Sequence, residues 1–298
     1  MVAVGQNAPR PSGRPEMQLG RAMPSNSINT NVGAMVAIST FNAINAEMAE
    51  VQMRITTGRK VNSVKDNPAI WAIAQNQRAE VRGLDAVKSS LQRGMSVVDI
   101  AITAAESVSE LLNEMKALAV SAADYPASDP ARTAINENYL ALRRQIDTAV
   151  QNASFGGLNL LAGGGSTDRV RALANTSATS TIDVDHLDLS TSGALLSGLP
   201  ADLMGSFTPT SVADVATATA NVNNAISRLG TGSKRLESHL KFVEKQQDAL
   251  EAGIGNLVDA DLAKESARWQ ALQVRQQLAI YAMRIANQQP SYLLQLFR

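Results

Sequence analysis

The chain of 298 residues contains no cysteine and few aromatic residues. Without cysteine it has no disulfide framework, no thiol catalysis and no cysteine-ligated zinc site. Phe, Trp and Tyr make up only 4% of the chain, which favours aliphatic helix packing over an aromatic-lined pocket. No apolar run reaches the roughly 18 residues of a membrane-spanning helix, so we expect no membrane insertion. Basic and acidic residues balance at 27 each, so no bulk charge attracts nucleic acid or an anionic membrane.

The N-terminal residues 1–26 are rich in Pro, Gly and Arg and hold few apolar side chains. Such a composition predicts a disordered tail, because too little apolar surface is available to offset the entropy of ordering. The tail also lacks the apolar stretch of a secretory signal peptide. If the protein leaves the cell, we expect it to use another export route.

Each end of the chain carries apolar residues that advance by alternating steps of four and three, which is heptad spacing on one helical face. Long apolar stripes need partner helices. Because both ends have one, we expect the two ends to pair with each other and with other copies. The stripes are Ala34, Ile38, Phe41, Asn45, Met48, Gln52 and Ile55, then Val258, Leu262, Glu265, Trp269, Leu272, Gln276, Ala279, Met283 and Ala286.

Three further helices are expected between the ends. Asp66, Asn67 and Pro68 form the start signal of an unusually long helix, with a capping side chain followed by proline. Asp129 and Pro130 repeat this signal for a shorter helix. The expected apolar stripes are Ile70, Ala74, Gln77, Val81, Leu84, Lys88, Leu91, Met95, Val98, Ile102 and Ala105, continued on a shifted face by Val108, Leu111, Met115 and Leu118; Ile135, Tyr139, Leu142, Ile146 and Ala149; and Val222, Ile226, Leu229, Ser233, Leu236, Leu240, Val243, Gln247 and Leu250.

The middle of the chain differs in composition, since Gly, Ser and Thr become frequent from Phe155 to about Pro209. Residues 170–173 and 181–189 alternate between apolar and polar, which predicts hairpin strands. No Lys or Arg occurs from Ala172 to Ser227, so this region is mildly acidic. We expect it to be exposed.

These patterns predict a mainly α protein: a long antiparallel coiled-coil-like helical bundle with paired N- and C-terminal helices and a small β-hairpin-containing middle segment. The expected division is a disordered tail at 1–26, a terminal-helix domain at 27–56 and 258–298, connectors at 57–67 and 253–257, a long-helix bundle domain at 68–160 and 211–252, and a short, variable, exposed middle at 161–210.

Residues suited to chemistry are scattered. The two histidines, His186 and His239, have no second ligand at metal-binding spacing, so we expect both to be solvated. The segment 230–234 resembles a phosphate loop only weakly, because Ser233 separates the second glycine from the lysine. Small residues that ease a close helix contact are the better interpretation. We expect no catalytic residue, no cofactor and no metal site.

Six motifs, in the same order along the chain, closely resemble those of bacterial flagellin, above all the short alphaproteobacterial flagellins. They are residues 27–31 (SINTN), 57–66 (TGRKVNSVKD), 90–97 (SLQRGMSV), 155–161 (FGGLNLL), 257–263 (LVDADLA) and 294–298 (LQLFR).

The resemblance implies a structural subunit that polymerises into the extracellular flagellar filament for motility, after export unfolded through the flagellar type III apparatus. It implies as partners other copies of the chain, hook-junction proteins, a filament cap and an export chaperone that binds the C-terminal helices. Together with the terminal stripes, it assigns to the polymerisation core Ile28, Val32, Ile38, Phe41, Met48, Ile55, Leu262, Trp269, Leu272, Leu278, Met283, Ile285, Leu293, Leu294, Leu296 and Phe297.

Two alternatives remain at this stage: the hook-to-filament junction protein, and a flagellin-like surface protein that binds an extracellular ligand. A binder would need an aromatic or charged cleft, yet residues 162–210 hold a single aromatic, Phe207. The sequence also departs from the family in residues 1–22, which precede the first motif. Because Met23 lies directly before that motif, we expect translation to start there; the alternative is a native, flexible tail.

Overall fold

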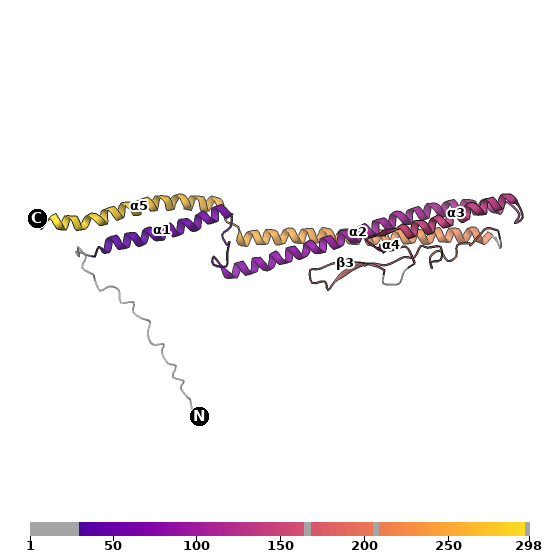
Figure 1. Ribbon diagram of the computed structural model, residues 1–298, viewed down its shortest axis with the longest axis horizontal. Coiled ribbons are helices and arrows are strands. Elements are labelled where there is room, and N and C mark those ends of the chain that lie inside the picture. Colours follow the sequence, from indigo (N-terminus) through magenta and orange to yellow (C-terminus); the bar gives the residue numbers. More distant parts are fainter. Residues whose placement is uncertain (1–29, 164–167, 205–208, 296–298) are drawn as a thin grey trace, which may run out of the picture. The chain divides into compact units, whose positions relative to one another are not determined.

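The computed structural model describes residues 30–163, 168–204 and 209–295, and the chain divides into two compact units. The first, here called the terminal unit, holds the described residues up to 71 and from 258 onward. The second, the long-helix unit, holds residues 72–257. Both are mainly helical, which confirms the expected fold class (Figure 1). No helix in the described ranges is long and apolar enough to cross a membrane.

The terminal unit is an antiparallel pair of helices, α1 (Val32–Thr57) and α5 (Leu262–Gln295), which lie side by side (Figure 1). Asn31 caps α1, because its Oδ1 accepts a hydrogen bond from the backbone N–H of Ala34 at 3.0 Å. Gly58 ends the helix in the left-handed region with φ 69°, as its position predicts. Ser27 and Asn29, which the sequence also offers as capping residues for the first helix, lie outside the described residues.

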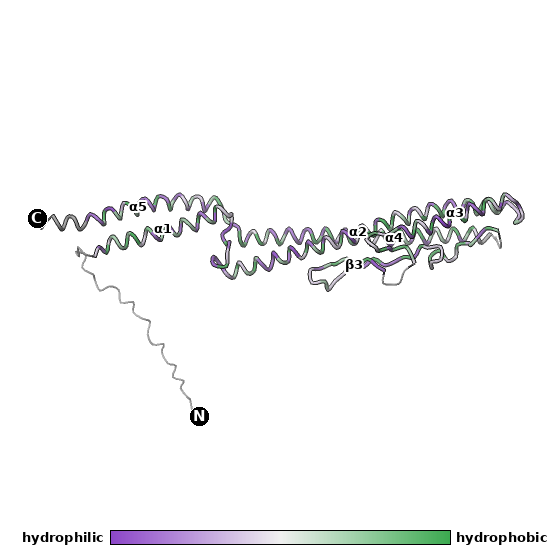
Figure 2. The backbone as a smooth tube through the Cα atoms, viewed as in Figure 1, coloured by the Kyte–Doolittle hydropathy of each residue, from purple (hydrophilic) through white to green (hydrophobic). Residues whose placement is uncertain are grey.

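The long-helix unit contains α3 (Pro130–Asn152) and most of α2 (Pro68–Ala123) and α4 (Pro209–Val258). The predicted starts of α2 and α3 are confirmed. The N–H of Ile70 donates to Asn67 Oδ1 at 3.0 Å, and that of Ala131 donates to Asp129 Oδ1 at 2.8 Å. Figure 2 shows polar and apolar residues alternating along these helices, as expected for elements with one packed face.

The packed face of α2 is a single unbroken heptad stripe, and α4 packs antiparallel against it. Two side-chain contacts show the direction: Ser233 donates to Asp99 at 3.3 Å, and Ser109 donates to Asn223 at 3.1 Å. The buried positions of α2 include Leu84, Val87, Leu91, Gly94, Val98, Ala101, Ala105, Val108, Leu112, Met115, Ala119 and Ala122. The expected shift to a second face after residue 105 is therefore wrong.

Small residues account for that error. In place of the expected Lys88, Met95 and Ile102, the core uses Val87, Gly94 and Ala101. In α4 it likewise uses Ala225 and Gly232 in place of the expected Ile226 and Ser233. At Gly94 and Gly232 the nearest neighbours are side chains of β3 and β4, so these small core positions make room for other parts of the chain.

Two small antiparallel hairpins occupy the middle of the chain. Strand β1 (Ser154–Phe155) pairs with β2 (Leu158–Asn159), and β3 (Val170–Leu173) pairs with β4 (Thr181–Val184). The second hairpin was expected, but its last strand ends at Val184 rather than at Leu189. Beyond it, the backbone N–H groups of Leu187 and Leu189 donate to the carbonyls of Leu160 and Leu161 at 2.8 and 2.9 Å.

The β3–β4 hairpin lies directly on the long helices because glycines leave room for it. A Cβ on Gly232 of α4 would lie 2.9 Å from Cγ2 of Val184, and one on Gly83 of α2 would lie 2.8 Å from Cγ2 of Thr176. Both distances are shorter than real carbon contacts. The small residues of segment 230–234 thus ease a close contact with the hairpin rather than with another helix.

Two smaller expectations are wrong. The segment 253–257 is helical, since α4 continues through its glycines to Val258. The histidines are not simply solvated: Nε2 of His239 lies 2.8 Å from the carbonyl oxygen of Ala174, and His186 Nε2 contacts the carbonyl oxygen of Ala162. Each histidine therefore fastens a segment of the middle region.

A buried arginine of α3 holds the end of the middle region. Arg132 donates from Nε and Nη2 to the carbonyl of Leu203 at 2.8 and 2.7 Å, and from Nη1 to that of Tyr125 at 3.1 Å. Asn136 accepts from the N–H of Leu203 at 2.7 Å. The hydroxyl of Tyr139 donates to the carbonyl of Pro200 at 2.9 Å, and burial raises the pKa of this phenol.

Candidate assembly surface

The seam between α1 and α5 is a small apolar cluster. Its fully buried members are Ile44, Val51, Leu272 and Ala279, and Phe41, Met48, Ile55 and Trp269 pack against them. On α5 the stripe positions predicted from Glu265 to Ala286 are all at least partly buried, whereas Leu262, also predicted, is exposed. On α1 the stripe was predicted only in part. At every second position the buried residue is Ala37, Ile44 or Val51, one residue before the predicted Ile38, Asn45 or Gln52.

Polar contacts fix the register of this seam. Gln276 donates to Asn45 at 2.7 Å, Arg54 lies 3.4 Å from Glu265, and Arg268 contacts Glu47. Glu265 is only 8% exposed, and its Oε2 has no hydrogen-bond partner within the described structure. If one helix shifted along the other, these polar groups would lose their partners. The polar residues within the stripe therefore set the register of the pair, as expected of a coiled coil.

A second apolar stripe runs along α5 on the side away from the seam. We call it the outer stripe: Val274, Leu278, Tyr281 and Ile285, which advance by steps of four, three and four. These side chains are 56–67% exposed. In a heptad they occupy the positions opposite the seam. The terminal unit therefore presents an apolar row that its own two helices leave uncovered.

The outer side of α1 adds apolar residues near the start of that helix. Val32, Met35, Val36 and Ile38 are exposed there, and Met53 is exposed near its end. Together with the four residues of the outer stripe, these five exposed apolar side chains on a two-helix unit indicate a binding face rather than scattered exposure.

The predicted core residues fall into three groups. Phe41, Met48, Ile55, Trp269, Leu272 and Met283 lie in the seam. Val32, Ile38, Leu262, Leu278 and Ile285 are exposed on the terminal unit. Ile28, Leu296 and Phe297 lie outside the described residues, as do the side chains of Leu293 and Leu294. Sequence reasoning missed Met35, Val36, Val274 and Tyr281; the four-three spacing of the outer stripe was the available signal.

The connector after α1 is a tight structure built on Asp66. Its Oδ2 accepts the backbone N–H groups of Asn62 and Ser63 at 2.9 and 2.8 Å. These hydrogen bonds, that of Asn62 first, lower the pKa of the Asp66 carboxyl. Backbone hydrogen bonds from Lys60 to Val258 and from Ala260 to Gly58, 2.7 and 2.8 Å long, tie the connector to the start of α5.

We expect this connector to loosen in acid. A carboxyl whose folded pKa lies below its unfolded value of about 3.9 contributes stability above that value, and the contribution is lost as pH falls through the folded pKa. The protection factors for amide hydrogen exchange at Asn62 and Ser63, which are corrected for the intrinsic rate, should therefore fall in that range. In Asp66→Asn the exchange should be fast at every pH once the intrinsic rate is removed. Unchanged protection of both amides below the folded pKa would contradict the assignment.

Within the described ranges, no cluster of three or more His, Asp or Glu could hold a metal ion. Hollows do occur on the long-helix unit, one of them between β4 and α4. The candidate site is therefore the apolar surface of the terminal unit, which suits association with another protein surface.

These features place the chain among mainly helical proteins in which the N- and C-terminal helices pair. In the sequence, the middle of the chain follows one set of long helices and precedes another. Two family models match: the bacterial flagellin N-terminal helical region over residues 28–166, and the bacterial flagellin C-terminal helical region over residues 212–297. The chain belongs to the bacterial flagellins.

Curated relatives agree with this assignment. Flagellin FljM of Caulobacter vibrioides is 44% identical over 93% of this chain and its own entire length, and a flagellin of Brucella melitensis is 32% identical over 91% of this chain and 99% of its own. Among solved structures, a protein from Vibrio parahaemolyticus described as flagellar hook-associated covers 65% of this chain and 100% of its own, with a TM-score of 0.54. At 17% identity this last likeness concerns the fold alone.

Proposed function

We propose that the chain is the structural subunit of a bacterial flagellar filament, assembled through the surfaces of the terminal unit. The outer stripe supports this proposal independently of family membership. It is an exposed apolar row opposite a seam that is already occupied, so covering it requires a surface from outside the unit. In a filament that surface belongs to other copies, through heterologous contacts that do not close into a ring.

The proposed layering follows the expected division of the chain. Residues 27–56 and 258–298 form the innermost layer, residues 68–160 and 211–252 the surrounding one, and the middle lies outside. The polymerisation core includes the seam, the outer stripe and the terminal residues Ile28, Leu293, Leu294, Leu296 and Phe297. The family assignment and the exposed apolar surface support this arrangement.

The remaining parts of the proposal rest on family membership. The subunit acts as a structural protein and not as an enzyme, and works outside the cell after unfolded export through the flagellar type III apparatus. Its further partners are the hook-junction proteins, the filament cap and an export chaperone that binds the C-terminal helices. A role as hook-to-filament junction protein is the second candidate, favoured only by the fold of the Vibrio relative.

Electron microscopy of sheared surface appendages, with mass identification of their subunit, tests the proposed function. Long filaments made mainly of this chain are the expected result. Detection only at the base of filaments made of another protein would favour the junction role. Absence from the appendages would overturn both.

Trypsin is expected to trim the free chain from its ends. Within the described residues the seam buries far fewer apolar side chains than the long-helix unit does, so the terminal unit should open far more often. Cleavage should begin at Arg54, Arg59, Arg268 and Arg275 and leave a fragment from about residue 60 to 268, which mass spectrometry would identify. Assembled filaments should resist this trimming. Equal digestion of free and assembled chain would contradict the proposed ordering on assembly.

A further inference from the structure

One face of α2 carries acidic side chains that lack partners. Glu106, Glu110 and Glu114 are exposed, and the described structure gives none of them an ion pair or a hydrogen bond. They occupy heptad positions outside its buried stripe, whereas Asp99 on the same helix accepts a hydrogen bond from Ser233 of α4. We call these three glutamates the acidic row. Such a row repels itself and attracts a basic surface.

A basic groove lies on another side of the long-helix unit, between α4 and β4. Its deeper part, about 310 Å³, has apolar residues at its base, Arg228 and Arg235 on the α4 wall, and Asp183 and Asp185 on the β4 side. Thr231 and Arg235 also line a second, shallower part of the groove. The wall of this shallower part is formed by Lys234, His239 and Phe242. Phe242 is 58% exposed.

The charges of the groove are only partly compensated within the chain. Asp185 lies 3.9 Å from Arg228, and Asp183 lies 3.8 and 3.9 Å from Arg169 and Arg171. Lys234 and Arg235 are exposed, and neither has an ion pair in the part of the chain that the structure describes. The groove therefore keeps excess positive charge beside an exposed aromatic ring.

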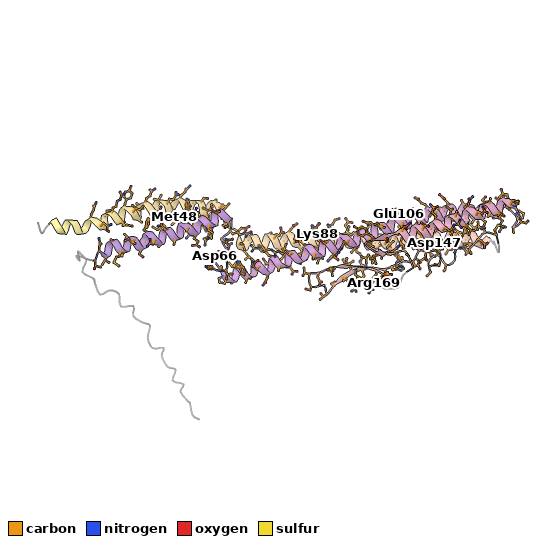
Figure 3. All side chains as sticks on the ribbon, viewed as in Figure 1. Met48, Asp66, Lys88, Glu106, Asp147 and Arg169 are labelled. Carbon is orange, nitrogen blue, oxygen red and sulfur yellow. The ribbon has the colours of Figure 1, made fainter. Side chains whose placement is uncertain are left out.

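The acidic row and the basic groove cannot meet within one molecule. Figure 3 shows Glu106 and Arg169 toward different edges of the long-helix unit, and Asp99 lies level with Ser233, directly before Lys234. Glu110, the centre of the acidic row, lies 11 residues beyond Asp99, which is about 17 Å at the rise of an α-helix. A second copy of the same polarity, displaced along the helix axis by about this distance, would bring its acidic row to the groove.

We propose that the acidic row of one copy docks against the basic groove of its neighbour, as a second contact between subunits in addition to that of the terminal unit. The inference rests on the proposed filament function. It assigns the partner of the groove by charge: a helix face of this same chain with uncompensated carboxylates. The contact is heterologous, because two different surfaces meet, so it can repeat along a filament.

Charge reversal tests the contact. The variants are Glu106→Lys/Glu110→Lys/Glu114→Lys, then Lys234→Glu/Arg235→Glu, and a chain that carries all five substitutions. Each reversal alone should raise the critical concentration for assembly at low salt about tenfold, since several exposed pairs change from attractive to repulsive. The chain with all five, and a mixture of the two single-set variants, should recover, because opposite charges meet again.

Matched controls are the exposed α3 residues changed by Glu137→Lys and Arg144→Glu, which should leave the critical concentration unchanged. Thermal unfolding of each variant before assembly checks that the fold is intact. Reversals without effect, or a five-substitution chain that assembles worse than either parent, would overturn the docking contact alone. If the unmodified chain fails to assemble under any salt condition, the proposed function and this inference fall together.

Discussion

Purified chain carrying Leu278→Asp and Ile285→Asp is expected to remain unassembled at concentrations where the unmodified chain forms filaments. Both side chains are more than 60% exposed on the outer stripe, so the changes should hardly affect the helix pair itself. In the assembled state each aspartate would be buried without a partner, at a cost of several kcal/mol. A total of about 4 kcal/mol corresponds to a roughly 1000-fold rise in critical concentration.

The control is Gln270→Asp with Gln277→Asp, which places the same charges one heptad apart on the same helix but beside the outer stripe. This variant should assemble within about tenfold of the unmodified concentration. Sedimentation of polymer from a dilution series measures both. Normal assembly of the variant with aspartate on the outer stripe would remove that row from the subunit contact.

Arg132→Ala is expected to lower the free energy of unfolding of the long-helix unit by about 3 kcal/mol. The guanidinium is buried and donates to the carbonyls of Leu203 and Tyr125, and its loss leaves buried acceptors unpaired. The midpoint of thermal unfolding, followed by circular dichroism, should fall by roughly 6–12 °C.

Arg143→Ala provides the comparison, because Arg143 makes one exposed hydrogen bond, 3.0 Å long, to the carbonyl of Ala201. We expect a loss below about 1 kcal/mol from it. Equal losses in the two variants would show that the buried arginine does not hold the middle region.

The sequence was sufficient for the mainly helical fold, the pairing of the ends and most helix starts. Capping residues followed by proline located the starts of α2 and α3 at Asn67 and Asp129. These signals are local, and the structure retains them. The α5 seam was also predicted correctly, since its large residues, Trp269 and Leu272, stand at the true heptad positions.

The heptad phase was less well predicted where alternate core positions hold small residues. In α2 the pattern passes through Lys88 and Met95 if large side chains are followed, yet Val87 and Gly94 are the buried pair. A glycine or alanine carries almost no hydropathy signal. It becomes a core residue only because another segment approaches closely, which is information held by the tertiary structure.

The assembly surface was predicted in part for a related reason. Leu278 and Ile285 were assigned to the core, but their neighbours Val274 and Tyr281 were not, because a search for one packed face ends when one stripe has been found. A helix that serves two partners has two stripes, and only the burial of the first reveals that the second is uncovered.

The seating of the β3–β4 hairpin determines where the chain could accept added length. Strand β3 packs against Gly94, β4 against Gly232, and Thr176 of the turn against Gly83, whereas residues 177–180 at the tip are exposed. Lengthening a loop whose ends are already fixed costs only about 0.6 kcal/mol for each doubling. Foreign peptides inserted at this tip would leave the helical scaffold intact, and a filament of such subunits would display the peptide once per subunit.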